Sequence, residues 1–144
     1  MPRTDSEQAR TDTEQARTDT GLPPRPSITL GDIVLDTDDP PRLAEFYSAL
    51  LGWPIIRCEE DWWSIRTETG PQMSFQLALD HRPPSWPTND VPQQFHLDLD
   101  VADLPSAVAY AQSLGATLAD NSHSAETFVV LLDPSGHPFC LCSG

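Results

Sequence analysis

The stretch QFHLDLDVAD, residues 94–103, decides the fold of this chain. Apolar and polar residues alternate along it: the apolar set is Phe95, Leu97, Leu99 and Val101, and the polar set is Gln94, His96, Asp98 and Asp100. Alternation with a period of two predicts a β-strand with one buried face. The opposite face is polar and carries the imidazole of His96, so it is the face on which we look for a site.

The same pattern occurs 64 positions earlier. Residues 28–36 (ITLGDIVLD) predict an equivalent strand, in which Asp32 takes the place of His96. After the first strand Asp38 and Asp39, and after the second strand Asp103, are placed to cap a helix with proline in its first turn. Each helix carries one apolar stripe and ends at a glycine. A shift that holds through an entire unit indicates a duplicated βαβββ module.

We therefore predict an α+β fold in which tandem βαβββ modules form a curved mixed sheet around a shared cleft. Module one is predicted at residues 28–80, the linker at 81–92 and module two at 93–143, within a domain of residues 28–144. The remaining strands are predicted at residues 54–58, 61–67 and 72–79 of module one, and at residues 116–119, 127–132 and 138–142 of module two.

Residues 1–27 are predicted to be a tail and linker outside the fold. Residues 3–21 repeat with period seven (RTDSEQA, RTDTEQA, RTDTG), with one alanine as the only apolar residue of each full heptad. A coiled coil needs apolar residues at two positions per heptad, so this repeat cannot bury a seam. We expect a disordered or transiently helical tail, followed by a stiff proline-rich linker.

The charge of the chain excludes several partner classes. The formal net charge is −14, and residues 28–144 carry four arginines against 17 acidic residues. Such a surface repels phosphate backbones and anionic lipids, so we expect no nucleic-acid and no membrane partner. The chain has no apolar run long enough to span a bilayer and no signal-like start, which predicts a cytoplasmic protein. Three cysteines in that setting predict reduced thiols.

Several runs resemble the vicinal oxygen chelate superfamily, which includes glyoxalase I, bleomycin-resistance proteins and extradiol dioxygenases. These runs are DTDDPPRLAEFYSALLGW, MSFQLA, QFHLDLDVADL and VLLDPSGHPFCL. The likeness covers about residues 28–143 and is closest to small bacterial glyoxalase-like domain proteins. The resemblance implies tandem βαβββ modules around a shared cleft, and it allows a homodimer.

The resemblance also implies four ligand positions. Metal-using members offer a histidine on the first strand of a unit and a glutamate on its last, which here correspond to Asp32, Gln76, His96 and Cys140. Glyoxalase I needs a glutamate base, and ring-opening dioxygenases need iron on two histidines and a carboxylate. Only His96 is of the usual type, so the resemblance argues against both activities. No cofactor is the first expectation, and a divalent zinc, nickel or iron ion is the alternative.

Three functions follow as hypotheses. The first is a metal-free module that binds a small molecule in the cleft through Gln76, His96, Trp62 and Trp63; the acidic cleft favours a neutral or cationic ligand. The second is a lyase or isomerase that uses His96 and Asp32 as an acid/base pair or as metal ligands. The third is a docking surface with the N-terminal repeat as its recognition arm.

Each candidate also has a structural alternative. His96 could be satisfied by Asp32 or Asp98 alone, since buried polar groups are normally hydrogen-bonded. Trp62 and Trp63 could serve ordinary packing. Cys140 could be a small buried hydrophobic residue.

Overall fold

The computed structural model describes residues 22–27, 30–86, 88–93, 95–119 and 127–143. Contacts divide the chain into residues 1–30 and residues 31–144, and every described helix and strand belongs to the second unit. The heptad repeat at residues 3–21 lies outside the described residues, so its disorder stays a prediction.

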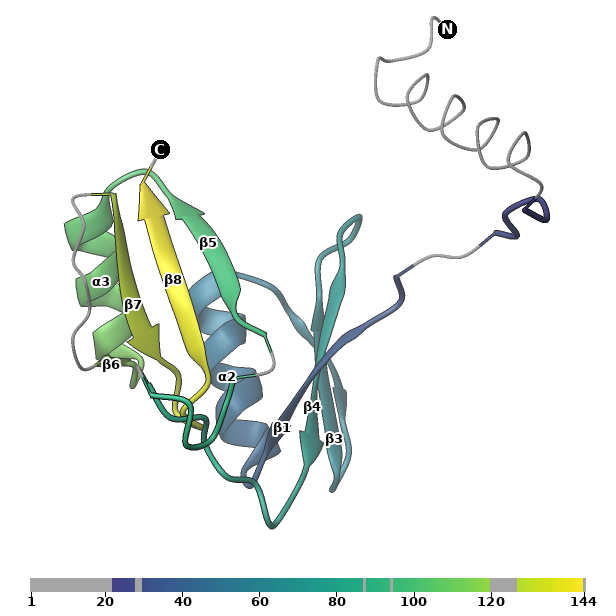
Figure 1. The fold of residues 1–144 in the computed structure, drawn as a ribbon, viewed down its shortest axis with the longest axis horizontal. Helices are drawn as coiled ribbons and strands as arrows, with labels where there is room; N and C mark the ends of the chain where they lie inside the picture. The colour runs from purple at the N-terminus through teal and green to yellow at the C-terminus, as the bar shows by residue number, and fades with distance from the viewer. Residues whose placement is uncertain (1–21, 28–29, 87, 94, 120–126, 144) are drawn as a thin grey trace, which may run out of the picture. The chain divides into compact units, whose positions relative to one another are not determined.

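The second unit contains two βαβββ modules, which confirms the predicted fold class (Figure 1). Module one consists of β1 (Ile33–Thr37), α2 (Pro40–Leu51), β2 (Ile55–Cys58), β3 (Trp62–Arg66) and β4 (Gln72–Leu77). Module two consists of β5 (Leu97–Val101), α3 (Leu104–Ser113), β6 (Thr117–Leu118), β7 (Phe128–Leu132) and β8 (Pro138–Ser143). Within the described residues, five residues of β1 and five of β5 pair with a neighbouring strand; residues 28, 29 and 94 of the predicted strands lie outside the described residues.

Each module has its own four-stranded mixed sheet, in the orders β1-β4-β3-β2 and β5-β8-β7-β6. The first strand of each module runs parallel to the last, and the other neighbours are antiparallel. The repeat of 64 does not hold in the parallel pairs, because Asp36 pairs with Gln76 whereas Asp100 pairs with Cys142. In module two, each residue of the first strand therefore pairs with a residue of the last strand that lies two positions later than the repeat of 64 would give. A shift of two keeps every side chain on its face.

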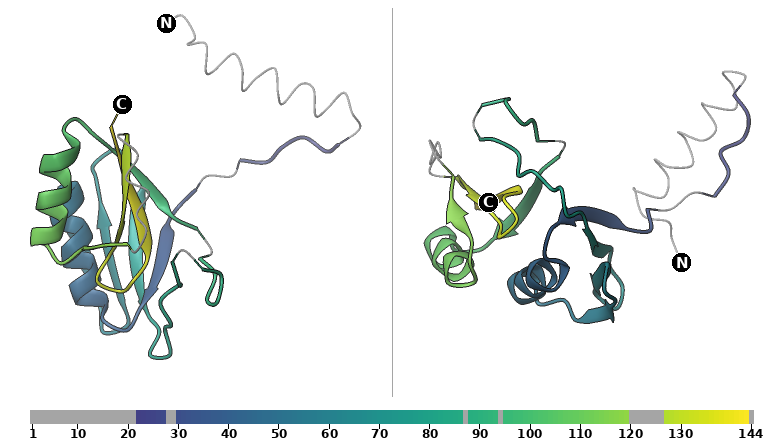
Figure 2. Two further views of the ribbon diagram at one scale, coloured as in Figure 1. Left: turned by 60° about the vertical axis from the view of Figure 1, so that its left-hand side comes forward. Right: turned by 90° about the horizontal axis from the view of Figure 1, so that it is seen from below.

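The helices pack on the apolar faces of the sheets, and the two modules share one core. Asp39 caps α2 by accepting a hydrogen bond from the backbone N–H of Arg42, and Gly52 ends the helix with φ of 73°. Tyr47 of α2 stacks on Phe75 of β4 at 5.7 Å and meets Phe139 of β8 edge-on. Both views of Figure 2 show α2 and α3 side by side. Among the described elements, both helices therefore lie on the apolar faces of the sheets.

The turn between β7 and β8 joins module two to module one through buried hydrogen bonds. The Tyr47 hydroxyl donates to Asp133 Oδ2 at 2.6 Å, and Thr37 Oγ1 lies 2.7 Å from Ser135 Oγ. Burial raises the pKa of Asp133 above its ordinary value of 3.8. Burial, followed by the negative charge of Asp133, raises the pKa of Tyr47. These contacts hold the relative position of the two modules within the second unit.

Candidate functional site

Module two has a cavity of about 420 Å³ on the polar face of its sheet. It is lined by His96, Asp98, Thr127, Phe128, Cys140, Cys142 and Ser143. The alternation of β5 and β8 explains this lining, because Leu97, Leu99, Phe139 and Leu141 belong to the core and their neighbours must point the other way. His96, which directly precedes β5, thus lines the cavity on this polar face.

Three side chains form a polar cluster in the module-two cavity. His96 Nε2 lies 3.3 Å from Asp98 Oδ1, and Asp98 lies opposite Cys140 in the parallel pair. The potential ligand atoms of the three residues lie within 4.8 Å of one another, the one such group of three or more among the described residues. His96 thus has the carboxylate partner that its structural alternative requires. It also remains substantially exposed and is available to a ligand.

Cys140 is held as a neutral thiol. Burial raises its pKa to about 11, and the negative charge of Asp98 and a hydrogen bond to that carboxylate add to the shift. Burial, followed by the charges of Asp98 and Asp100, also raises the pKa of Cys142. At neutral pH neither sulfur is a thiolate nucleophile, since the thiolate is the reactive form.

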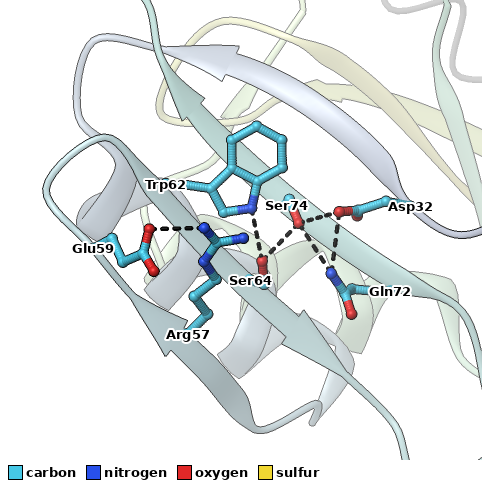
Figure 3. A network of polar contacts seen from close by, with 7 residues as sticks. All are labelled: Asp32, Arg57, Glu59, Trp62, Ser64, Gln72 and Ser74. Atoms are coloured by element: carbon cyan, nitrogen blue, oxygen red, sulfur yellow. Dashed lines mark hydrogen bonds and ion pairs between the residues drawn. The ribbon is translucent and has the colours of Figure 1, made fainter.

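The polar face of module one carries a chain of hydrogen bonds that runs in one direction (Figure 3). Trp62 Nε1 donates to Ser64 Oγ at 3.1 Å, and Ser64 Oγ lies 2.7 Å from Ser74 Oγ. Ser74 Oγ donates to Asp32 Oδ2 at 2.6 Å, and Gln72 Nε2 donates to the same oxygen at 3.1 Å. Because the Asp32 carboxylate can only accept, Ser74 donates its hydrogen to Asp32 and Ser64 must donate to Ser74, so the chain ends on the carboxylate.

Asp32 Oδ1, the second oxygen of that carboxylate, is buried without a hydrogen-bond partner among the described residues. The two neighbouring tryptophans of β3 face opposite sides. Trp62 lies on the polar face beneath the guanidinium of Arg57, 5.5 Å from the ring centroid, whereas Trp63 packs against the core. The structure thus supports the structural alternative for Trp63, whereas Trp62 is half-buried on the polar face and is not part of the module-two cavity lining.

The four positions that the resemblance implies as metal ligands fall into two places. His96 and Cys140 meet in the cavity of module two, whereas Asp32 is not among the ligand atoms gathered there. Asp32 Oδ2 is already occupied by two donors, and Gln76 is an exposed residue of β4. These residues do not fit the four-ligand site of the superfamily, and we derive no metal-dependent step from it.

Sequence reasoning missed Ser64 and Ser74. By the repeat of 64, Gln76 is the counterpart of Cys140, and Val34 is the counterpart of Asp98. In the sheets, however, Val34 pairs with Ser74, whereas Asp98 pairs with Cys140. Ser74 therefore holds the position that Cys140 holds in module two. The available signal was the alternation of apolar and polar residues along 72–79, which puts Ser74 on the polar face of that strand.

Comparison with known proteins agrees with the fold. A family model described as a glyoxalase-like domain matches residues 32–142. The chain belongs to this glyoxalase-like domain family, within the vicinal oxygen chelate superfamily. A search of curated proteins finds no significant match. In the described part of the chain no helix is long and apolar enough to cross a membrane.

Solved structures show the same fold at low sequence identity. A glyoxalase/bleomycin resistance protein/dioxygenase family enzyme from Burkholderia phytofirmans is 19% identical, with a TM-score of 0.62 over 81% of this chain and 98% of that one. A glyoxalase-related enzyme from Fulvimarina pelagi is 14% identical, with a TM-score of 0.62 over 82% and 89% of the two chains. A glyoxalase/dioxygenase from Nostoc punctiforme is 16% identical, with a TM-score of 0.61 over 85% and 94%.

Proposed function

We propose that this glyoxalase-like domain protein binds a small organic molecule in the module-two cavity. The observation that carries the proposal is the convergence of a polar cluster and an aromatic wall on one cavity of about 420 Å³. Small-molecule sites typically have volumes of roughly 300–1,000 Å³, apolar walls and a few convergent polar groups. Phe128 supplies the aromatic wall, and His96, Asp98 and Cys140 supply the polar groups.

The chemistry of the lining favours a neutral or cationic ligand. Asp98 offers carboxylate oxygens, which accept hydrogen bonds and attract positive charge. Cys140 adds a neutral thiol, so it brings no negative charge and no nucleophile at neutral pH. The acidic domain repels anionic ligands over a longer range. A flat ligand with one N–H donor would direct that donor to Asp98 and its ring to Phe128.

The enzyme hypothesis needs His96 and Asp32 to act on one substrate. The two residues occupy different surroundings: His96 lines the module-two cavity, and Asp32 ends the hydrogen-bond chain of module one. This geometry gives the acid/base pair no support.

A second candidate function is divalent-metal binding by His96, Asp98 and Cys140. The observation that favours it is the distance of at most 4.8 Å between their potential ligand atoms. One imidazole, one carboxylate and one thiol are a donor set that suits zinc once the thiol has lost its proton. Elemental analysis of untagged protein and of His96→Ala decides this candidate: one equivalent of zinc that the variant loses would support it.

A fragment screen tests the first proposal. Neutral and cationic aromatic fragments are screened by ligand-observed NMR in the presence of EDTA, and hits are repeated on variants. We expect hits whose binding weakens at least fivefold in His96→Ala and in Phe128→Ala. Leu118→Ala changes an exposed side chain of β6 outside the cavity lining and should leave binding unchanged. No hits, or hits indifferent to both cavity variants, would overturn the proposal.

A further inference from the structure

A second cavity, of about 290 Å³, lies between β1 and the linker that joins the modules. It shares no lining residue with the module-two cavity. Val34 and Asp36 of β1 form one side, and His81, Arg82, Phe95 and His137 are the other principal lining residues. Its volume lies just below the usual range for drug-sized ligands, so it suits a compact molecule.

Several contacts fix the walls of this second cavity. His81 Nε2 lies 2.9 Å from the carbonyl oxygen of Ser135, and the linker segment also bonds to itself. His137 Nε2 lies 2.6 Å from the carbonyl oxygen of Asp36. Gly136 sits so close to the linker that an added Cβ would lie 2.5 Å from Pro83 Cβ. The linker, the turn and β1 are thus held together before any ligand arrives.

The two histidines of the second cavity have defined roles as acceptors. A backbone carbonyl can only accept a hydrogen bond, so Nε2 of each ring must carry the hydrogen. In the neutral ring Nδ1 then carries a lone pair. The ring centroids of His81 and His137 are 4.9 Å apart, so the two imidazoles lie next to each other in the cavity lining. The Asp36 carboxylate is a third acceptor in the same cavity.

The second cavity also holds two opposite charges that do not neutralise each other. Among the described residues, neither the Asp36 carboxylate nor the Arg82 guanidinium has an ion-pair or hydrogen-bond partner. The two side chains line the same cavity yet do not pair with one another. Val34 and Phe95 add apolar surface to its walls. A cavity that presents separate negative and positive groups is complementary to a molecule with both charges.

We propose that the second cavity is a binding site for a small zwitterion, an α-amino acid with a short apolar side chain. An ammonium group has three N–H donors, which match Asp36 and the Nδ1 atoms of His81 and His137. A carboxylate matches the forked donors of Arg82. The side chain lies against Val34 and Phe95. This proposal goes beyond the ligand of the module-two cavity and does not depend on it.

Three related probes test the zwitterion proposal. L-Valine carries both charges, isobutylamine is valine without its carboxylate, and isovalerate is valine without its ammonium. Each is titrated into isotopically labelled protein while NMR follows the His81 and His137 imidazoles. We expect valine to bind at least fivefold more tightly than either single-charge probe. Equal affinities for the three probes, or no response of these imidazoles to valine, would overturn the proposal.

Charge-neutralising variants of the second cavity sharpen the test. Asp36→Asn should weaken the binding of valine and isobutylamine at least fivefold and leave the binding of isovalerate unchanged. Arg82→Gln should weaken valine and isovalerate and spare isobutylamine. Asp100→Asn, which removes an exposed charge of β5 outside this cavity, is the matched control and should change none of the three. Both exposed variants are expected to fold, and loss of binding without this crossed pattern would contradict the assigned roles.

The variant His96→Ala separates this proposal from the function proposed for module two. It removes a residue of the module-two cavity and leaves the second cavity intact. Valine binding should therefore be the same in His96→Ala and in the wild type. A loss of valine binding in that variant would show that valine occupies the module-two cavity, which would overturn the second site.

Discussion

Cys140 lies directly opposite Asp98 in the parallel pair of β5 and β8, and its sulfur lies within 4.8 Å of a carboxylate oxygen of Asp98. This contact exists because the pair is two residues further along in module two than in module one. It places the Asp98 carboxylate beside the sulfur of Cys140, at a position where the resemblance implies a glutamate. Burial, followed by the negative charge of Asp98, raises the pKa of the Cys140 thiol and keeps it protonated at neutral pH, so the cavity offers a neutral thiol to a ligand.

The first prediction concerns the reactivity of Cys140. A pKa of about 11 against the ordinary 9.0 lowers the thiolate fraction at pH 7.5 about a hundredfold, and the higher nucleophilicity of a more basic thiolate recovers roughly tenfold. Iodoacetamide should therefore alkylate Cys140 about tenfold more slowly than exposed Cys58. Mass spectrometry of timed samples measures both rates. Asp98→Asn should speed up the alkylation of Cys140 and leave that of Cys58 unchanged. A Cys140 that reacts before Cys58 in the wild type would contradict the raised pKa of Cys140.

The second prediction concerns the hydrogen-bond chain of module one. Ser74→Ala removes the hydroxyl that links Ser64 to Asp32, and it leaves a partly buried carboxylate short of a donor. The free energy of unfolding should fall by about 1.5–3 kcal/mol, since hydrogen bonds to charged groups are worth that much. Urea titration measures the loss. Ser113→Ala, at an exposed hydroxyl, should cost less than about 0.5 kcal/mol. Equal costs for the two variants would show that the chain contributes no more stability than a surface contact.

The third prediction concerns the buried pair of Tyr47 and Asp133. Tyr47→Phe removes the hydroxyl donor and should cost about 1–3 kcal/mol at neutral pH. The Tyr47 hydrogen bond lowers the pKa of Asp133, whose burial raises it more strongly, so the variant should raise that pKa further.

The pH dependence of this variant has a defined sign. Since the folded pKa of Asp133 lies above its ordinary value of 3.8, the folded state binds more protons between the two values. Stability from this group is therefore fully present below 3.8 and is lost as pH rises through the folded pKa. The cost of Tyr47→Phe should be larger at pH 8 than at pH 4. Urea titrations at both pH values measure this cost. An equal cost at both would contradict the further rise of the Asp133 pKa that we expect in the variant.

The fourth prediction concerns the contact between the linker and the turn of module two. Gly136 has φ of 86°, and a Cβ there would meet Pro83. Gly136→Ala should lower the free energy of unfolding by more than about 1 kcal/mol, from strain at positive φ and from the clash. Adding Pro83→Gly should recover only the part of the lost free energy of unfolding that comes from the clash. Failure of the double variant to recover any stability would argue that the linker does not pack on this turn.

Much of the fold could be predicted because its signals are local. The alternation around His96, the aspartate caps and the helix-ending glycine at Gly52 each act within a few residues. The predicted βαβββ order is therefore confirmed for both modules. Cytoplasmic location, a homodimer and the absence of nucleic-acid partners stay predictions.

The site could be predicted only in part, because it depends on register. Alternation placed His96 on the polar face, the resemblance gave Cys140 as a ligand position, and the structure brings the two residues together in one cavity. It could not reveal the two-residue difference between the parallel pairs, because a shift of two leaves every residue on the same face. That difference puts Asp98 beside Cys140 and Ser74 beside Asp32.

The most direct test of a ligand site in module two is to map where organic fragments bind on isotopically labelled protein in the presence of EDTA. We expect that hits from the fragment screen shift the signals of His96, Phe128 and Cys140 together, and that His96→Ala weakens their binding at least fivefold. Fragments that bind only after zinc is restored, or that shift no signal of this cavity, would contradict the claim that module two holds a metal-independent site for a small molecule.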